Sequence, residues 1–309
     1  MRAAMSATTT VMPRAGRLRV YASFVRFEHT LFSLPLILAG VFSDFGPPMS
    51  ASRWLLVAIA AVGARTAAMA LNRLIDRRLD ALNPRTQSRE LPAGRMKMAE
   101  AIALLAVSTA AYLLACAALG PWFLRVAPVP LAVFAGYPYL KRFTALCHFG
   151  VGLALALAPL AGYAAAHPGL EHPGPALWLS AFAFAWVSGF DIIYATLDEQ
   201  FDRAQGVHSM VAWLGRARAL RVSAVLHSIA FGCLLPVVGQ LWKGALLPSG
   251  APWALPVVGL LVATAGALLY LEQRWAEDVN LAFFKVNVYV GFVVLGVVLV
   301  TRLESGGYF

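Results

Sequence analysis

Two groups of carboxylates carry the clearest chemistry in this 309-residue sequence. In the first group, Asn72, Asp76 and Asp80 follow one another at intervals of four residues. Residues three or four apart lie on one face of a helix, so these side chains should stack. Stacked carboxylates repel each other unless a cation lies between them. The spacing therefore predicts a cation site near the end of a helix, where the sequence turns polar.

A second group of residues repeats this pattern further along the chain. Its members fall at intervals of three and four, again on one predicted helix face: Asp191, Tyr194, Asp198 and Asp202. An offset of 122 residues aligns the two groups, with Asp76 on Asp198, Asp80 on Asp202 and Asn72 on Tyr194. The offset predicts an ancient duplication of a four-helix unit, residues 18–140 and 144–271, followed by a ninth helix.

Oxygen ligands on two opposed helices suit Mg²⁺. This ion takes one or two carboxylates and completes its shell with water and substrate phosphate. We therefore expect a diphosphate bridged by Mg²⁺, with the metal ligands Asp76, Asp80, Asp198, Asp202 and Asn72. The sequence has no GxxxxGK[ST] or GxGxxG motif, which argues against ATP and dinucleotides.

Several cations stand where they could serve the same site. Lys141 and Arg142 end a predicted span, where they would either grip diphosphate oxygens or anchor the helix at the membrane surface. Arg65 precedes Asp76 on the same face, about 16 Å deeper by helical rise. A cation at that depth should face the interior. It would bind an anionic acceptor or pair with Asp191 or Glu28.

The first predicted span also contains polar residues. Arg26, Glu28 and His29 must lie against protein or a cavity, and Arg26 shares a helix face with His29. A substrate site and structural pairing are equally open for these residues.

The composition indicates that a membrane positions all these residues. The chain is 60% hydrophobic and 13% charged, whereas soluble domains carry about 25% charged residues. About nine apolar segments are long enough to span a bilayer. We predict an all-α polytopic membrane protein with one domain, residues 18–309, after a short cytoplasmic tail, residues 1–17. The expected spans are 18–43, 53–75, 98–119, 122–140, 144–166, 176–197, 217–241, 252–271 and 282–302.

The net charge of +10 does not indicate nucleic acid, because most Lys and Arg residues fall in alternate loops. This asymmetry predicts a multi-pass protein of the inner cell membrane, with both carboxylate groups on its cytoplasmic side. The three cysteines lie in or beside spans without CxxC spacing, and we interpret them as buried apolar residues.

At these residues the sequence resembles the UbiA superfamily of intramembrane prenyltransferases. Both carboxylate motifs match, as does Tyr-Pro-x-x-Lys-Arg-x-Thr at 137–144. The resemblance implies nine helices in a barrel around a lipid-open cavity, where Mg²⁺-assisted loss of diphosphate gives an allylic cation that an aromatic ring attacks. Segments including Asn83-Pro84-Arg85-Thr86 resemble the 4-hydroxybenzoate polyprenyltransferase branch, part of which uses a naphthoate acceptor. Arg73 departs from the pattern, because many relatives have an acidic residue there.

The predicted function is therefore Mg²⁺-dependent transfer of a polyprenyl group from its diphosphate to an aromatic acid, in ubiquinone or menaquinone synthesis. The residues expected to take part in catalysis are Asp76, Asp80, Asp191, Asp198 and Asp202. Those expected to contact the substrates are Asn72, Tyr194, Lys141, Arg142, Arg65, Arg26 and Arg85.

Three alternatives stay open. A haem O or chlorophyll synthase would share the motifs. A transporter would place its carboxylates near the bilayer midplane. A purely structural membrane protein would leave Arg65 unexplained.

Overall fold

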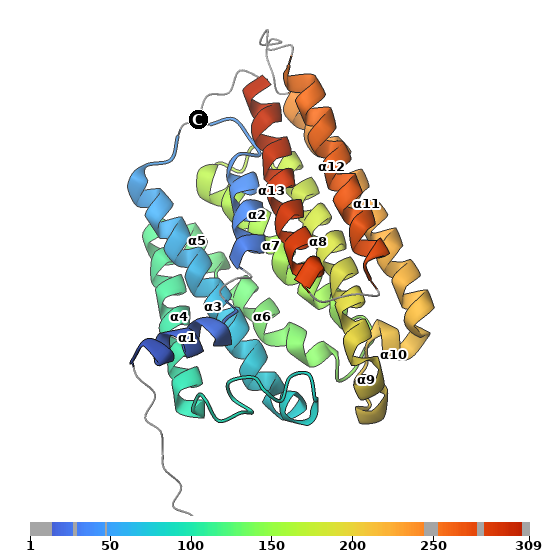
Figure 1. Ribbon diagram of the computed structural model, residues 1–309. Helices are drawn as coiled ribbons and strands as arrows, with labels where there is room; N and C mark the ends of the chain where they lie inside the picture. Colours follow the sequence, from blue (N-terminus) through green and yellow to red (C-terminus); the bar gives the residue numbers. More distant parts are fainter. Residues whose placement is uncertain (1–13, 27–29, 47, 244–252, 277–280, 305–309) are drawn as a thin grey trace, which may run out of the picture.

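The computed structural model describes residues 14–26, 30–46, 48–243, 253–276 and 281–304, and within these ranges every regular element is helical (Figure 1). The first half contains α1 (Arg14–Phe24), α2 (Thr30–Val41), α3 (Ala51–Leu82), α4 (Met98–Leu119), α5 (Pro121–Val126) and α6 (Pro128–Leu140). The second half contains α7 (Cys147–Ala166), α8 (Gly174–Ala195), α9 (Glu199–Gln205), α10 (Met210–Leu214), α11 (Arg216–Lys243), α12 (Ala254–Arg274) and α13 (Leu281–Glu304).

The prediction of an all-α membrane protein is confirmed. Among the described residues, eight helical segments are long and apolar enough to cross a membrane. One of them, α4, has the bounds 98–119 that the sequence predicts. The short helices α9 and α10 lie at the same end of the bundle as the loop that follows α3 (Figure 1).

The expected first span, residues 18–43, is not one helix. The chain forms α1, which begins at Arg14 within the predicted tail, and the separate 12-residue α2. Arg26 follows α1 with φ 49°, a left-handed conformation that a right-handed helix cannot continue. As Figure 1 shows, α1 lies across the bundle near α3 instead of running along it. Glu28 and His29 lie outside the described residues.

The expected span 122–140 is also divided. Its two parts, α5 and α6, meet at Ala127, and Pro128 occupies the first turn of α6. Proline fits the first turn of a helix, where its missing N–H has no partner to lose. Together the two helices still form one candidate span, Pro121–Leu140.

Helix α8 forms the centre of the bundle. Its large side chains Leu179, Phe182 and Trp186 are fully buried. They pack in one cluster with residues of α2, α11, α12 and α13. A helix that is apolar on every face is expected to be surrounded by other helices. Asp191 and Tyr194, which begin the second group, are therefore carried by a helix with little room to move.

Helices α2 and α7 approach each other closely through glycine. A Cβ atom on Gly40 would lie 2.0 Å from the carbonyl oxygen of Pro159, and one on Gly162 would lie 2.0 Å from that of Ile37. Small residues allow this backbone contact between membrane helices. The contact ties the short α2 to the bundle.

A buried polar network joins α8, α11 and α12. Gln273 Nε2 donates to Ser223 Oγ at 2.8 Å and to His227 Nδ1 at 2.9 Å. Trp186 Nε1 donates to Glu272 Oε1 at 3.3 Å. Polar groups in an apolar interior are costly without partners. The network supplies partners for several of these groups and links the three helices, whereas His227 Nε2 and Glu272 Oε2 are buried without a hydrogen-bond partner.

Candidate active site

The first carboxylate group lies in the last turns of α3. This helix has 32 residues and is about 48 Å long, whereas the hydrocarbon core of a bilayer is about 30 Å thick. Asp76 and Asp80 are nevertheless buried, with 1% and 6% exposure. Neighbouring protein segments, and not solvent, therefore surround both carboxylates.

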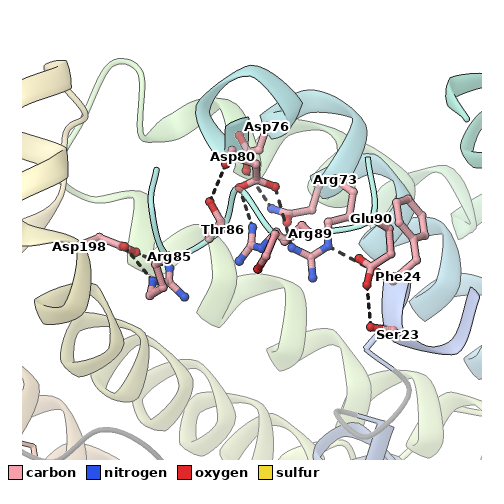
Figure 2. Close-up of polar contacts among 12 residues, drawn as sticks. Ser23, Phe24, Arg73, Asp76, Asp80, Arg85, Thr86, Arg89, Glu90 and Asp198 are labelled. Carbon is pink, nitrogen blue, oxygen red and sulfur yellow. Dashed lines mark hydrogen bonds and ion pairs between the residues drawn. The ribbon is translucent and has the colours of Figure 1, made fainter. Parts of the chain in front are cut away.

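Each carboxylate of the first group has a cationic partner. Lys141 Nζ donates to Asp76 Oδ2 at 2.5 Å, and Asn72 Nδ2 donates to the same oxygen at 3.2 Å. Arg89 Nη1 donates to Asp80 Oδ1 at 2.6 Å. Figure 2 shows Arg89 and Arg73 gathered around Asp80, with Arg73 Nη1 at 3.9 Å from Asp80 Oδ2.

The helix that carries the second group is interrupted. The sequence predicts one continuous face, but α8 ends at Ala195 and a 3-10 turn, Thr196–Asp198, separates it from α9. Thr196 Oγ1 donates to the Ile193 carbonyl oxygen at 2.7 Å and fixes this turn. Asp198 is the residue before α9, and Asp202 lies buried within α9.

The loop after α3 joins the two groups. Asn83 Nδ2 and Arg85 Nε each donate to Asp198 Oδ1 at 2.8 Å. Arg85 Nη2 donates to the other oxygen, Asp198 Oδ2, so the guanidinium grips the carboxylate with two parallel bonds (Figure 2). Arg85 Nη1 also donates to Tyr194 Oη at 2.8 Å, and the guanidinium lies 4.8 Å from the Tyr194 ring centre.

Charge on this loop is stabilised by its partners. Burial alone would lower the pKa of Arg85, but the hydrogen bond to Asp198 and nearby negative charge raise this pKa above its usual value. Burial would raise the pKa of Glu90, yet a hydrogen bond from Ser23 Oγ at 2.6 Å and nearby cations hold it below its usual value. Arg85 and Glu90 therefore stay charged while Arg85 contacts the second carboxylate group and Glu90 contacts α1.

The two predicted cations after α6 also reach the first group. In addition to the Lys141 bond, Arg142 Nη2 donates to the Ile75 carbonyl oxygen at 2.8 Å and lies 3.9 Å from Asp76 Oδ1. His208 N donates to the Lys141 carbonyl oxygen at 2.8 Å. The end of α6 thus lies between the first group and the segment after α9.

Arg65 and Arg26 make no hydrogen bond to the described residues of either carboxylate group. Arg65 is on α3, its Nε is buried without a hydrogen-bond partner, and Tyr137 of α6 lies near it. Asp191 on α8 pairs with His148, not with Arg65. Arg26 follows α1.

Sequence reasoning missed His148. Its Nε2 accepts the Met210 backbone N–H at 3.2 Å, so the ring proton lies on Nδ1, which donates to Asp191 Oδ2 at 2.6 Å. His148 is buried at the start of α7, and α10 supplies the fixing bond. A lone histidine in an apolar segment gives no sequence signal, since its partners come from two other helices.

The oxygen ligands of the site fit Mg²⁺ completed by phosphate. Asp76 Oδ1 and Asp80 Oδ2 are buried without hydrogen-bond partners. In the described part of the chain, no three His, Cys, Asp or Glu residues come together closely enough to hold a metal ion. Because Mg²⁺ commonly binds through one or two carboxylates and substrate phosphates, a sparse set of carboxylates suits a metal that arrives with a phosphorylated ligand.

The fold and the site define an integral membrane protein in which two carboxylate groups and several cations meet at one end of a helical bundle. The UbiA prenyltransferase family profile matches residues 33–289. The chain therefore belongs to the UbiA prenyltransferase family, and it is a membrane-embedded prenyltransferase.

Known proteins support this assignment in sequence and in fold. The chain is 31% identical to the 4-hydroxybenzoate octaprenyltransferase of Cupriavidus necator over 81% of its length and 85% of the relative's. It is 28% identical to the enzyme of that name from Dechloromonas aromatica, covering 94% and 96% of the two chains.

Solved structures share the architecture. The apo structure of a UbiA homolog from Aeropyrum pernix K1 has a TM-score of 0.75 and 31% identity, covering 89% of this chain and 98% of that one. A UbiA homolog from Archaeoglobus fulgidus, solved with GPP and Mg²⁺, has a TM-score of 0.69 at 18% identity, covering 93% and 99% of the two chains. The second likeness concerns the fold alone.

Proposed function

We propose that the chain transfers a polyprenyl group from a polyprenyl diphosphate to an aromatic acid, 4-hydroxybenzoate or a related naphthoate, for ubiquinone or menaquinone synthesis. The observation that carries the proposal is the meeting of both carboxylate groups with Lys141 and Arg85 at one end of the bundle. The names of the relatives from Cupriavidus and Dechloromonas support the aromatic acceptor. Inner-membrane location with the site facing the cytoplasm belongs to the same proposal.

The diphosphate would lie between the two groups. Asp76, Asp80, Asp198 and Asp202, with Asn72, would hold Mg²⁺, which when bound neutralises charge on the departing diphosphate. Lys141, Arg142 and Arg85 would bind phosphate oxygens through charge-assisted hydrogen bonds. The allylic C–O bond breaks, and the diphosphate leaves with the bonding electrons.

The aromatic acid would lie deeper, beside the allylic carbon. Arg65 offers a buried guanidinium on α3 whose Nε has no partner, which suits an acceptor carboxylate. Asp191 and Tyr194, in the last turns of α8, would lie between the acceptor and the diphosphate, and Arg26 would approach from the end of α1. The ring carbon forms the new C–C bond and then loses its proton.

Membranes that contain the expressed chain would test the proposal. They are incubated with labelled 4-hydroxybenzoate, a polyprenyl diphosphate and Mg²⁺, and a parallel arm replaces the acceptor with a dihydroxynaphthoate. We expect label in the lipid extract in one arm, and none with an Asp76→Asn/Asp198→Asn double variant. Transfer to haem or to a chlorophyllide, with no transfer to either aromatic acid, would overturn the proposed acceptor.

A further inference from the structure

The protein itself already neutralises three carboxylates of the site. Lys141 pairs with Asp76, Arg89 with Asp80 and Arg85 with Asp198. A divalent cation that binds these carboxylates must therefore overcome repulsion from the protein's own cations.

The two groups differ in how many of their carboxylate oxygens accept hydrogen bonds. Asp76 Oδ1 and Asp80 Oδ2 have no hydrogen-bond partner, so each carboxylate of the first group keeps one oxygen for a ligand. Both oxygens of Asp198 are bound, Oδ1 by Asn83 and Arg85 and Oδ2 by Arg85. A metal that binds Asp198 must therefore compete with Arg85 for the carboxylate.

The position of Arg85 favours its release from Asp198. It comes from the loop after α3, not from a helix, and its side chain is 28% exposed, whereas that of Asp198 is 15% exposed. A bidentate guanidinium binds phosphate with the same fork that it uses for a carboxylate. Diphosphate between the two groups would therefore offer Arg85 an equivalent partner with more negative charge.

We propose that Arg85 is an exchangeable counter-ion that closes the second carboxylate group until diphosphate arrives. Arg85 then moves from Asp198 to the diphosphate, and the metal takes its place on Asp198. Metal and diphosphate consequently bind cooperatively, and the ligand-free protein binds a divalent cation weakly at the second group. The inference rests on the proposed function only in taking the ligand to be a diphosphate.

Binding of Mn²⁺ to the full chain in lipid nanodiscs, measured by electron paramagnetic resonance, tests this exchange. For the wild-type chain, inorganic pyrophosphate should tighten Mn²⁺ binding at least about 10-fold. Arg85→Gln should tighten Mn²⁺ binding without pyrophosphate, on the order of 10-fold, because a cation beside Asp198 is gone. The enhancement by pyrophosphate should shrink in the same variant.

The matched control is Arg95→Gln. Arg95 lies on the same loop, but it pairs with Glu90 and has a 45% exposed side chain. The control should leave both Mn²⁺ affinities within about 2-fold of wild type, because exposed charges at a distance are screened. An Arg85→Gln/Asp198→Asn double variant should lose the gain.

Two results would overturn the exchange. One is Mn²⁺ affinity in Arg85→Gln that is unchanged or weaker without pyrophosphate, and the other is an equal gain in Arg95→Gln. Should Arg85→Gln fail to fold by thermal melting, Arg85→Met removes the same cation while it keeps the apolar stem, and it should show the same gain. Neither prenyl donor nor aromatic acceptor is present, so failure of prenyl transfer and failure of this exchange are separate outcomes.

Discussion

The first and second carboxylate groups share a sequence spacing but differ in their local structure. Asp76 and Asp80 lie within one long helix and are buried beneath cations. Asp198 lies in a 3-10 turn between two helices, gripped by an arginine from a loop. The first group is thus held by a continuous helix, whereas the second is held by a turn and by contacts from a loop. A repeated motif therefore need not supply two equivalent half-sites.

The two groups also differ in the residue that precedes the carboxylates on each helix. On α3 the deeper residue is the cation Arg65, and on α8 it is Asp191, held by His148. The deeper residue of α3 is therefore suited to an anionic group, and the deeper residue of α8 to a proton donor. The duplication of a four-helix unit stays a prediction, and these differences show how far two copies could diverge.

Removal of metal should have the largest effect, because both groups would then lack the ion that offsets diphosphate charge. Turnover should fall to background after exhaustive chelation. Mg²⁺ should restore it fully, Mn²⁺ partly and Ca²⁺ poorly, since Mg²⁺ favours a compact octahedral site. The assay is transfer of label into lipid extract across a metal titration. Full activity in the chelated enzyme would exclude the metal site at both groups.

Substitution of one carboxylate at a time separates the two groups. Asp76→Asn and Asp198→Asn should each lower kcat/KM by on the order of 10³-fold. Asp76→Asn should also destabilise the ligand-free protein by about 1–3 kcal/mol, because Lys141 and Arg142 lose a buried partner. Asp198→Asn should cost less than about 1 kcal/mol, since Arg85 can turn toward solvent.

Activity assays and thermal melting of both variants in detergent provide the measurements. An equal loss of stability in the two variants would remove the proposed distinction between a rigid and an adjustable group. Near-normal activity in both would contradict the two-group metal site itself.

Arg65→Leu should act on the acceptor alone. Loss of a charge-assisted hydrogen bond, about 1.5–3 kcal/mol, should raise the apparent KM for the aromatic acid by on the order of 10- to 100-fold. The KM for the polyprenyl diphosphate should change little. Steady-state kinetics with each substrate varied in turn provides the test. A comparable loss for both substrates, or failure of the variant to accumulate in membranes, would favour a structural role.

The smallest effect should come from the end of α6. Lys141→Ala and Arg142→Ala should each raise the apparent KM for the diphosphate substrate by about 10-fold, one charged hydrogen bond each. Lys141 should matter more, because it bonds directly to Asp76 whereas Arg142 bonds to a backbone carbonyl. A change confined to the acceptor's KM would contradict this assignment.

Helix periodicity predicted the parts of the site that lie on one element. The spacing of Asn72, Asp76 and Asp80 placed them on one face of α3, and the Asn72–Asp76 hydrogen bond agrees with it. Composition predicted eight of the nine expected spans, all but 18–43, because apolar runs of about 20 residues have few alternatives to a membrane helix.

The contacts that depend on the path of a loop could not be predicted. The sequence does not indicate that Arg85 forms an ion pair with Asp198. It also does not indicate that His148 forms hydrogen bonds with both Asp191 and the N–H of Met210. The 3-10 turn Thr196–Asp198 could not be predicted for a similar reason. Spacings of three and four residues fit both a continuous α-helix and one that contains a 3-10 turn. The break after α1 depends on the backbone of Arg26, whose residue type does not specify it.

The length of α3 has a consequence for where the two substrates meet. Because the helix exceeds the hydrocarbon thickness by several turns, its carboxylates can lie at the level of the lipid headgroups while its middle stays among the acyl chains. Under the proposed function, a water-soluble aromatic acid and a lipid-soluble donor would then each reach the site from the medium in which they dissolve. The prenylated acid, far more apolar than its precursor, would partition into the bilayer and leave by the donor's route.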